Sequence, residues 1–105
     1  MKLIKDSNRK GDFAEYYAVT WLWDNGYEVF QNSGCTGPVD MIALDKKGKV
    51  ILIDVKTTHI EQDYEHLKKT RTKIQEKLGV KLLGFNPDTR ELRFVDHGVK
   101  GRPKK

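Results

Sequence analysis

The sequence predicts a single α/β domain in which helices flank a sheet of about five strands. The hydrophobic pattern has a helical period up to about Asn25 and then changes to short runs of β-branched and aromatic residues. Gly, Pro and Asn bound these runs, and a second helical segment interrupts them once. The elements therefore follow the order helix, three strands, helix, two strands, and a chain of 105 residues is long enough for only one core.

The first helix is predicted to start at a cap, Ser7 or Asn8, and to stop at about Asn25. At about 100° per residue, one stripe forms its core-facing side: Ala14, Ala18, Trp21 and Leu22. A second stripe carries Phe13, Tyr16, Thr20 and Trp23. Because so many exposed aromatic side chains would be unusual, the second stripe is predicted to meet another element or another subunit. We expect a homodimer through Phe13, Tyr16 and Trp23.

Short strands are predicted after this helix, at residues 27–31, 39–44 and 50–55. A polar turn at residues 45–49 joins the second and third strands as a hairpin. The segment 57–69 is charged and has no clear period, so we expect a loop or a short exposed helix there.

The second helix is predicted from the capping-box spacing between Thr72 and Gln75, and Gly79 supplies its end. The last two strands are predicted at residues 80–85 and 91–95. The predicted organisation is one domain at residues 1–98 and a basic, disordered tail at residues 99–105.

The composition favours a polyanionic partner and excludes some kinds of site. Lys and Arg outnumber Asp and Glu by 20 to 15, which gives a formal net charge of +5. The single cysteine, Cys35, excludes an internal disulfide and a cysteine-based zinc site. No segment has the pattern of a signal peptide or a membrane span, so we expect a cytoplasmic protein with no membrane partner.

An acid and a lysine, Asp54 and Lys56, stand two positions apart in an otherwise apolar run. Since side chains alternate along a strand, both point to the same side of the sheet. Two opposite charges in a buried strand are costly unless they have partners or a function. Asp45 and Lys47 have the same spacing, but they lie in a hydrated turn. Burial therefore distinguishes Asp54 and Lys56 as candidate functional residues, although a structural ion pair is the simpler interpretation of these two residues alone.

A third charged residue, Asp40, lies in the strand that is predicted to pair with the strand of Asp54. Carboxylates are ligands that Mg²⁺ prefers, with water and phosphate oxygens completing its octahedron. A metal held by both acids could polarise a phosphoryl oxygen and lower the pKa of a bound water, and Lys56 is placed to orient that water. The residues thus indicate a candidate Mg²⁺ site suited to phosphoryl chemistry, at which Mn²⁺ could substitute.

The order of these residues resembles the PD-(D/E)XK nuclease superfamily. The segments that carry the resemblance are Gly11-Asp12-Phe13-Ala14-Glu15, Pro38-Val39-Asp40 and Asp54-Val55-Lys56. The chain is most similar to small Holliday-junction-resolvase-like and phage-encoded endonucleases, over roughly residues 11–85. The resemblance implies a restriction-endonuclease-like core with a mixed central sheet flanked by helices. The residue between Pro38 and Asp40 makes this a looser form of the superfamily's motif.

The resemblance also implies roles for individual residues. It implies Glu15 as a helix-borne acid near the metal, Asp40 as the principal metal ligand, Asp54 as the second ligand, Val55 as a ligand through its carbonyl, Lys56 as the catalytic lysine and Gln75 as a supporting glutamine. Considered alone, Gln75 is most simply half of a capping box, and Glu15 a helix-surface acid.

We therefore expect a metal-dependent endonuclease that hydrolyses DNA, with junction or branched DNA as candidate substrates, in a bacterial, archaeal or phage-infected cell. Its DNA backbone contacts are expected from Lys68, Lys69, Arg71 and Lys73. Two alternatives stay open: a non-catalytic nucleic-acid-binding module or accessory subunit, and a nuclease that acts on RNA. No reader of base edges is visible in the sequence, so the substrate's structure also stays open.

Overall fold

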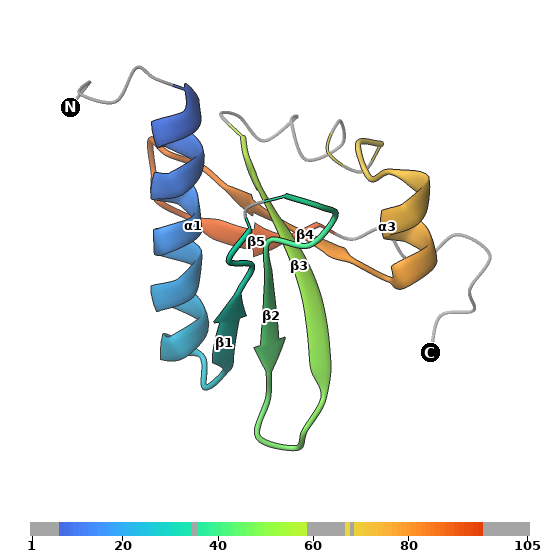
Figure 1. The fold of residues 1–105 in the computed structure, drawn as a ribbon. Coiled ribbons are helices and arrows are strands. Elements are labelled where there is room, and N and C mark those ends of the chain that lie inside the picture. Colours follow the sequence, from blue (N-terminus) through green and yellow to red (C-terminus); the bar gives the residue numbers. More distant parts are fainter. Residues whose placement is uncertain (1–6, 35, 59–66, 68, 96–105) are drawn as a thin grey trace.

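The computed structural model describes residues 7–34, 36–58, 67 and 69–95 (Figure 1). Predictions about Cys35, Lys68, the tail at 99–105 and most of the segment 57–69 lie outside these residues. In the described part, the chain forms helices on a five-stranded mixed sheet, which confirms the α/β class. Of the helices in this part, none is both long and apolar enough to cross a membrane.

Within the described residues, the helices and strands follow the predicted order along the chain. They are α1 (Ser7–Asp24), β1 (Glu28–Gln31), β2 (Met41–Leu44), β3 (Val50–Thr57), α3 (Lys73–Leu78), β4 (Lys81–Phe85) and β5 (Leu92–Phe94). The strands also lie in chain order across the sheet, and every neighbouring pair is antiparallel except β3 and β4, which are parallel. Figure 1 shows the strands between α1 on one side and α3 on the other.

The side chain of one acidic residue, Asp45, stabilises the turn between β2 and β3. The Asp45 carboxylate accepts hydrogen bonds from the backbone N–H groups of Lys47 and Lys49, each at 2.8 Å. Gly48 takes the left-handed conformation (φ 88°) that the turn requires. Asp45 and Lys47 thus belong to the turn, as predicted, and not to a buried site.

Helix α3 is short but capped at both ends. Thr72 and Gln75 form the predicted capping box, because each side chain bonds the other residue's backbone N–H. Gly79 ends the helix in the left-handed conformation (φ 75°), and its N–H bonds carbonyls of the last turn. The caps fix where α3 begins, and therefore where the Gln75 side chain lies.

The sheet has a different apolar cluster on each face. On the α1 face, the buried residues are Ala18, Val19, Leu22, Met41, Ala43, Ile53 and Leu83. On the other face, a smaller cluster contains Leu67, Leu82 and Val95. The predicted core stripe of α1 is confirmed, since Ala14, Ala18 and Leu22 are buried and Trp21 packs against the Phe94 ring. Asp54 lies on the face away from α1, because its neighbours Ile53 and Val55 pack toward α1.

Phe13, in the second stripe of α1, meets another element, which is one of the two outcomes predicted for this stripe. Its ring packs edge-on against Tyr17 and Phe85, with centroid distances of 5.2 and 6.0 Å. The Arg90 guanidinium lies 4.6 Å from the centre of the same ring. Helical periodicity could not reveal this contact, because Phe85 and Arg90 come from the distant β4–β5 hairpin. The predicted stripe is thereby reduced to Tyr16, Thr20 and Trp23, all of which are exposed.

Candidate active site

The candidate site lies where β2 and β3 separate. Their ladder runs from the pair Leu44 and Val50 to the pair Met41 and Ile53, and the Asp40 N–H adds one more bond, 2.8 Å, to the Ile53 carbonyl. Beyond that point the Asp40 carboxylate, through Oδ2, accepts a 2.7 Å hydrogen bond from the Val55 N–H. A side chain has thus taken the place of the next backbone acceptor. β3 itself continues to Thr57, because β4 pairs with its other edge.

At this fork the carboxyl groups of Asp40 and Asp54 lie close enough to affect each other's charge. The pKa of Asp40 is raised from 3.8 to about 7, first by burial and then by the hydrogen bond to Asp54. The Val55 N–H opposes the rise, and the charges of Asp54 and Glu15 add to it. Burial and the neighbouring acids therefore favour the protonated form of Asp40.

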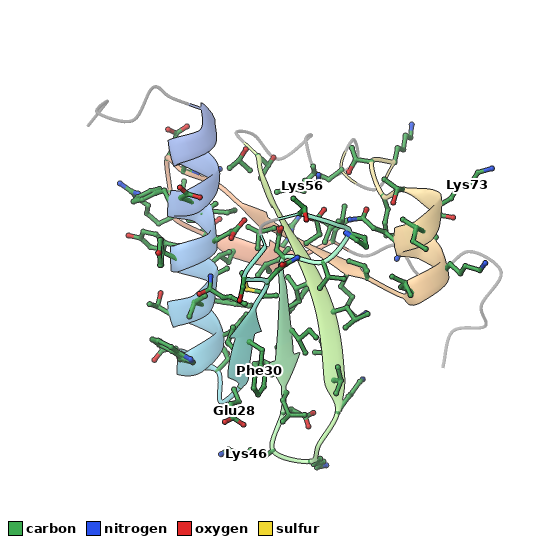
Figure 2. All side chains as sticks on the ribbon, viewed as in Figure 1. Glu28, Phe30, Lys46, Lys56 and Lys73 are labelled. Atoms are coloured by element: carbon green, nitrogen blue, oxygen red, sulfur yellow. The ribbon has the colours of Figure 1, made fainter. Side chains whose placement is uncertain are left out.

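Lys56 extends from the same strand as Asp54 and on the same side. Its Nζ lies 3.4 Å from Asp54 Oδ2. The Lys56 side chain is 40% exposed, whereas the Asp54 side chain is only 13% exposed. Lys56 is therefore accessible to solvent while it contacts a mostly buried carboxylate. Figure 2 shows Lys56 on the upper part of β3, between α1 and α3.

Gln75 is buried and ties three segments together. Its Nε2 donates to Asp54 Oδ2 at 3.1 Å and to the Pro38 carbonyl at 2.9 Å, while its Oε1 accepts the capping bond from the Thr72 N–H at 3.0 Å. The capping and supporting roles expected of this residue are compatible, because they use opposite ends of one amide. Gln75 thus fixes the orientation of the Asp54 carboxylate.

A Gln75→Glu variant is expected to lose about 1–3 kcal/mol of stability at pH 8. The new carboxylate can still accept the Thr72 bond, but it cannot donate to Asp54 or to the Pro38 carbonyl, and it places a second negative charge beside Asp54. Urea denaturation measures the loss, with Glu76→Gln on the exposed side of α3 as the control. Equal stability of Gln75→Glu and wild type would show that the two donated bonds do not hold the site together.

Glu15 approaches the pair from α1 but remains separate from it. Its pKa is raised, mainly by burial, then by the charge of Asp12 and then by that of Asp54. No hydrogen bond between Glu15 and the other two acids occurs within the part of the chain that is described. Within the same part, no three His, Cys, Asp or Glu side chains form a group that could hold a metal ion. The structure thus brings Asp40, Asp54, Lys56 and Gln75 into contact, with Glu15 near them.

The predicted phosphate-binding residues differ in availability. Lys69 and Lys73 are exposed, and Lys73 projects from α3 (Figure 2). Arg71 instead donates through a terminal guanidinium nitrogen to the Val80 carbonyl at 3.0 Å, and its Nε is buried. This contact ties the segment before α3 to the start of β4, so Arg71 is part of the scaffold and not a freely projecting cation. Lys68 lies outside the described residues.

The contacts that two residues make at the site were not predicted from the sequence. Asn32 directly follows β1 and lies beside the residues before β2. Its N–H donates to the Asp40 carbonyl at 3.0 Å, and its side-chain amide donates to the Val39 carbonyl at 2.9 Å. An Asn before a Ser-Gly pair is typical of a turn, and this pattern could have identified Asn32 as a residue that bonds nearby backbone groups. Pro38 supplies a carbonyl to Gln75 across 37 residues of sequence, and no local pattern indicates such a contact.

No protein-family model matches the chain, and no curated protein matches it.

Proposed function

We propose that the protein is a Mg²⁺-dependent endonuclease that hydrolyses phosphodiester bonds in DNA. The observation that carries the proposal is the grouping of the Asp40 and Asp54 carboxyl groups at the fork, with the Lys56 ammonium 3.4 Å from Asp54 Oδ2. Shifted pKa values with a specific charged partner are typical of functional sites. The resemblance to PD-(D/E)XK nucleases supplies the reaction class.

The residues present fit a hard divalent cation. The fork offers two carboxyl groups whose mutual repulsion is relieved by a proton, and a cation can replace that proton. Mg²⁺ commonly takes one or two carboxylates and completes its shell with water and phosphate oxygens, so a cluster of three acids is not needed. In this proposal Asp40, Asp54 and the Val55 carbonyl would hold the ion, with Glu15 beside them and Mn²⁺ able to substitute. The ion would supply positive charge against the phosphoryl oxygens and lower the pKa of water.

The chain's own residues would position the reactants. Lys56, held beside Asp54 but open to solvent, would donate to the attacking water or to a phosphate oxygen as charge develops. Gln75 would keep the Asp54 oxygens aimed at the fork, and the Val55 N–H would do the same for Asp40. Attack of water on phosphorus breaks the bond to the leaving 3′ oxygen, so we expect 5′-phosphate and 3′-hydroxyl ends, as the resemblance implies.

The DNA backbone would contact exposed lysines near the site. Lys69 and Lys73 are the described cations that could hold the backbone, and such contacts position DNA without reading its sequence. Two copies acting together would cut both strands of a duplex or junction, and this association is part of the proposal. Cleavage would take place in the cytoplasm of a bacterial, archaeal or phage-infected cell.

A non-catalytic nucleic-acid-binding module is the second candidate function. The Asp54–Lys56 contact is compatible with this candidate, because an ion pair that only stabilises the fold would have the same geometry. Against it stands the cost of keeping Asp40 close to Asp54, which a purely structural role does not explain.

Cleavage of labelled DNA tests the proposal. We expect purified protein to cut at least one of four substrates (a four-way junction, a flap, a linear duplex or a single strand) with Mg²⁺ or Mn²⁺ and not with EDTA. Tight binding without cleavage in any metal would favour the non-catalytic module. Cleavage of the matching RNA alone would reassign the substrate.

A further inference from the structure

The sheet face that carries Asp54 and Lys56 continues into an apolar surface. Strand register places Glu28, Leu44 and Val50 in one row across this face, and Phe30, Ile42 and Leu52 in the next. The row after that begins the candidate site at Asp40 and Asp54. We name the five apolar residues of the first two rows the sheet patch: Phe30, Ile42, Leu44, Val50 and Leu52.

The sheet patch is open to solvent, unlike the α1 side of the same strands. Phe30 is 52% exposed and Val50 is 54% exposed, and the other three residues are only partly buried. Helix α3 lies on the same face, since Gln75 reaches Asp54, and it adds Ile74 and Leu78, which are 50% and 46% exposed. Exposed apolar patches rimmed by polar residues mark interaction sites.

We infer that the sheet patch and α3 form a two-fold symmetric interface between two copies of this chain. On this face of the sheet, α3 covers one part, and no helix among the described residues covers the sheet patch beside it. A two-fold axis lying between the faces can place α3 of each copy over the sheet patch of the other. Ile74 and Leu78 then meet Phe30 and its neighbours, and both apolar surfaces leave water together.

Charges at the rim fit the same arrangement. Glu28 borders the sheet patch on β1, whereas Lys73 and Lys77 lie on α3, and Figure 2 shows Glu28 and Lys73 on opposite sides of this face. The two-fold axis that brings α3 over the sheet patch therefore brings each glutamate toward the partner's lysines. Opposite charges at an interface rim fix the register of association.

The remaining exposed aromatic residues, Tyr16 and Trp23 on α1, fit a second copy less well. Their exposed neighbours on the helix include Asp12 and Asp24. A symmetric contact through this stripe would bring like charges together, which is unfavourable. The larger apolar surface of the sheet patch, together with Ile74 and Leu78 of α3, thus favours it over the helix stripe as the contact between copies.

The size of the surface suits a modest dimer. A stable interface covers about 800 Å² on each partner, which is about a tenth of the 7585 Å² surface of this chain. Three strands spaced roughly 4.8 Å apart and one adjoining helix supply the apolar centre of such an area, and the charged rim supplies the remainder. The inference does not depend on the proposed function. If both are correct, the two sites lie at the border of one interface.

Sedimentation of the full chain at micromolar concentrations tests the inference. We expect wild type to form a dimer, Phe30→Asp to weaken the dimer at least about tenfold, and the double variant Tyr16→Ser/Trp23→Ser to leave it intact. All substituted residues are exposed, so the fold is retained, and thermal unfolding checks this. A monomeric wild type would overturn the inference. So would a dimer that survives Phe30→Asp and is lost in the α1 variant.

A charge reversal tests the arrangement without touching an apolar side chain. Glu28→Lys should weaken the dimer, and adding Lys73→Glu and Lys77→Glu in the same chain should restore it. If the triple variant dimerises no better than Glu28→Lys, then α3 does not lie over β1 of the partner, and the proposed interface is wrong.

Discussion

Replacing Lys56 with alanine is expected to lower the single-turnover rate of DNA cleavage by at least about a hundredfold, because a positioned donor to developing charge is lost. DNA affinity should change little, since Lys69 and Lys73 are the exposed cations proposed to hold the DNA backbone. The Asp54 carboxylate keeps its hydrogen bond from Gln75, so the variant should remain folded. The change should therefore appear in the rate of the chemical step and not in binding.

The chain contains a matched control for this substitution. Asp45 and Lys47 have the same spacing as Asp54 and Lys56, but they lie in the exposed β2–β3 turn. Lys47→Ala removes the same charge and should leave the cleavage rate within about twofold of wild type. Equal rates for Lys56→Ala and wild type would remove Lys56 from the chemistry and favour the structural ion pair.

Asp40→Asn is expected to abolish cleavage and, in EDTA at pH 8, to stabilise the protein by about 1–2 kcal/mol. An asparagine in the same place can accept from the Val55 N–H through its oxygen and donate to Asp54 through its nitrogen. It therefore imitates the protonated Asp40 at every pH. The full effect of the pKa rise would be larger, but Asp40 is only partly buried and water screens part of it.

The direction of the change in stability follows from the pKa of Asp40, which is about 7 in the folded chain and 3.8 ordinarily. Between these values the folded state keeps a proton that the unfolded state has lost, so stability falls as pH rises through this window. Wild type should lose stability from pH 5 to pH 8 relative to Asp40→Asn. Mg²⁺ should restore stability to wild type at pH 8 but not to the variant. Parallel stability curves for the two proteins from pH 5 to 8 would contradict the raised pKa of Asp40.

Much of the fold could be predicted from the sequence because its signals are local. The change from helical to strand periodicity, the Asp45 turn and the Thr72–Gln75 capping box each lie within a few residues, and each fixes one element. Boundaries were less accurate. β2 begins at Met41 and not at residue 39, because the Gln75 side chain takes the Pro38 carbonyl and Asp40 turns its own side chain to β3.

The candidate site was only partly predictable for a related reason. Asp40, Asp54 and Lys56 stood out because charge in apolar runs is costly and strand alternation places it on one side. The contacts that organise them depend on tertiary structure. Arg71 reaches the Val80 carbonyl, and Phe13 meets Phe85 and Arg90, only after the sheet has formed. Sequence periodicity predicts on which side of a helix or strand a residue lies. It does not predict which residue from a distant part of the chain will contact it.

The bond from the Val55 N–H to the Asp40 side chain also has an evolutionary consequence. The fork needs an acceptor at position 40, and both Asp and Asn supply one. Their codons differ by a single nucleotide, so, if the proposed function is correct, one mutation would convert an active protein into an inactive and more stable one with the same fold. Selection for stability would then oppose the return from Asn to Asp.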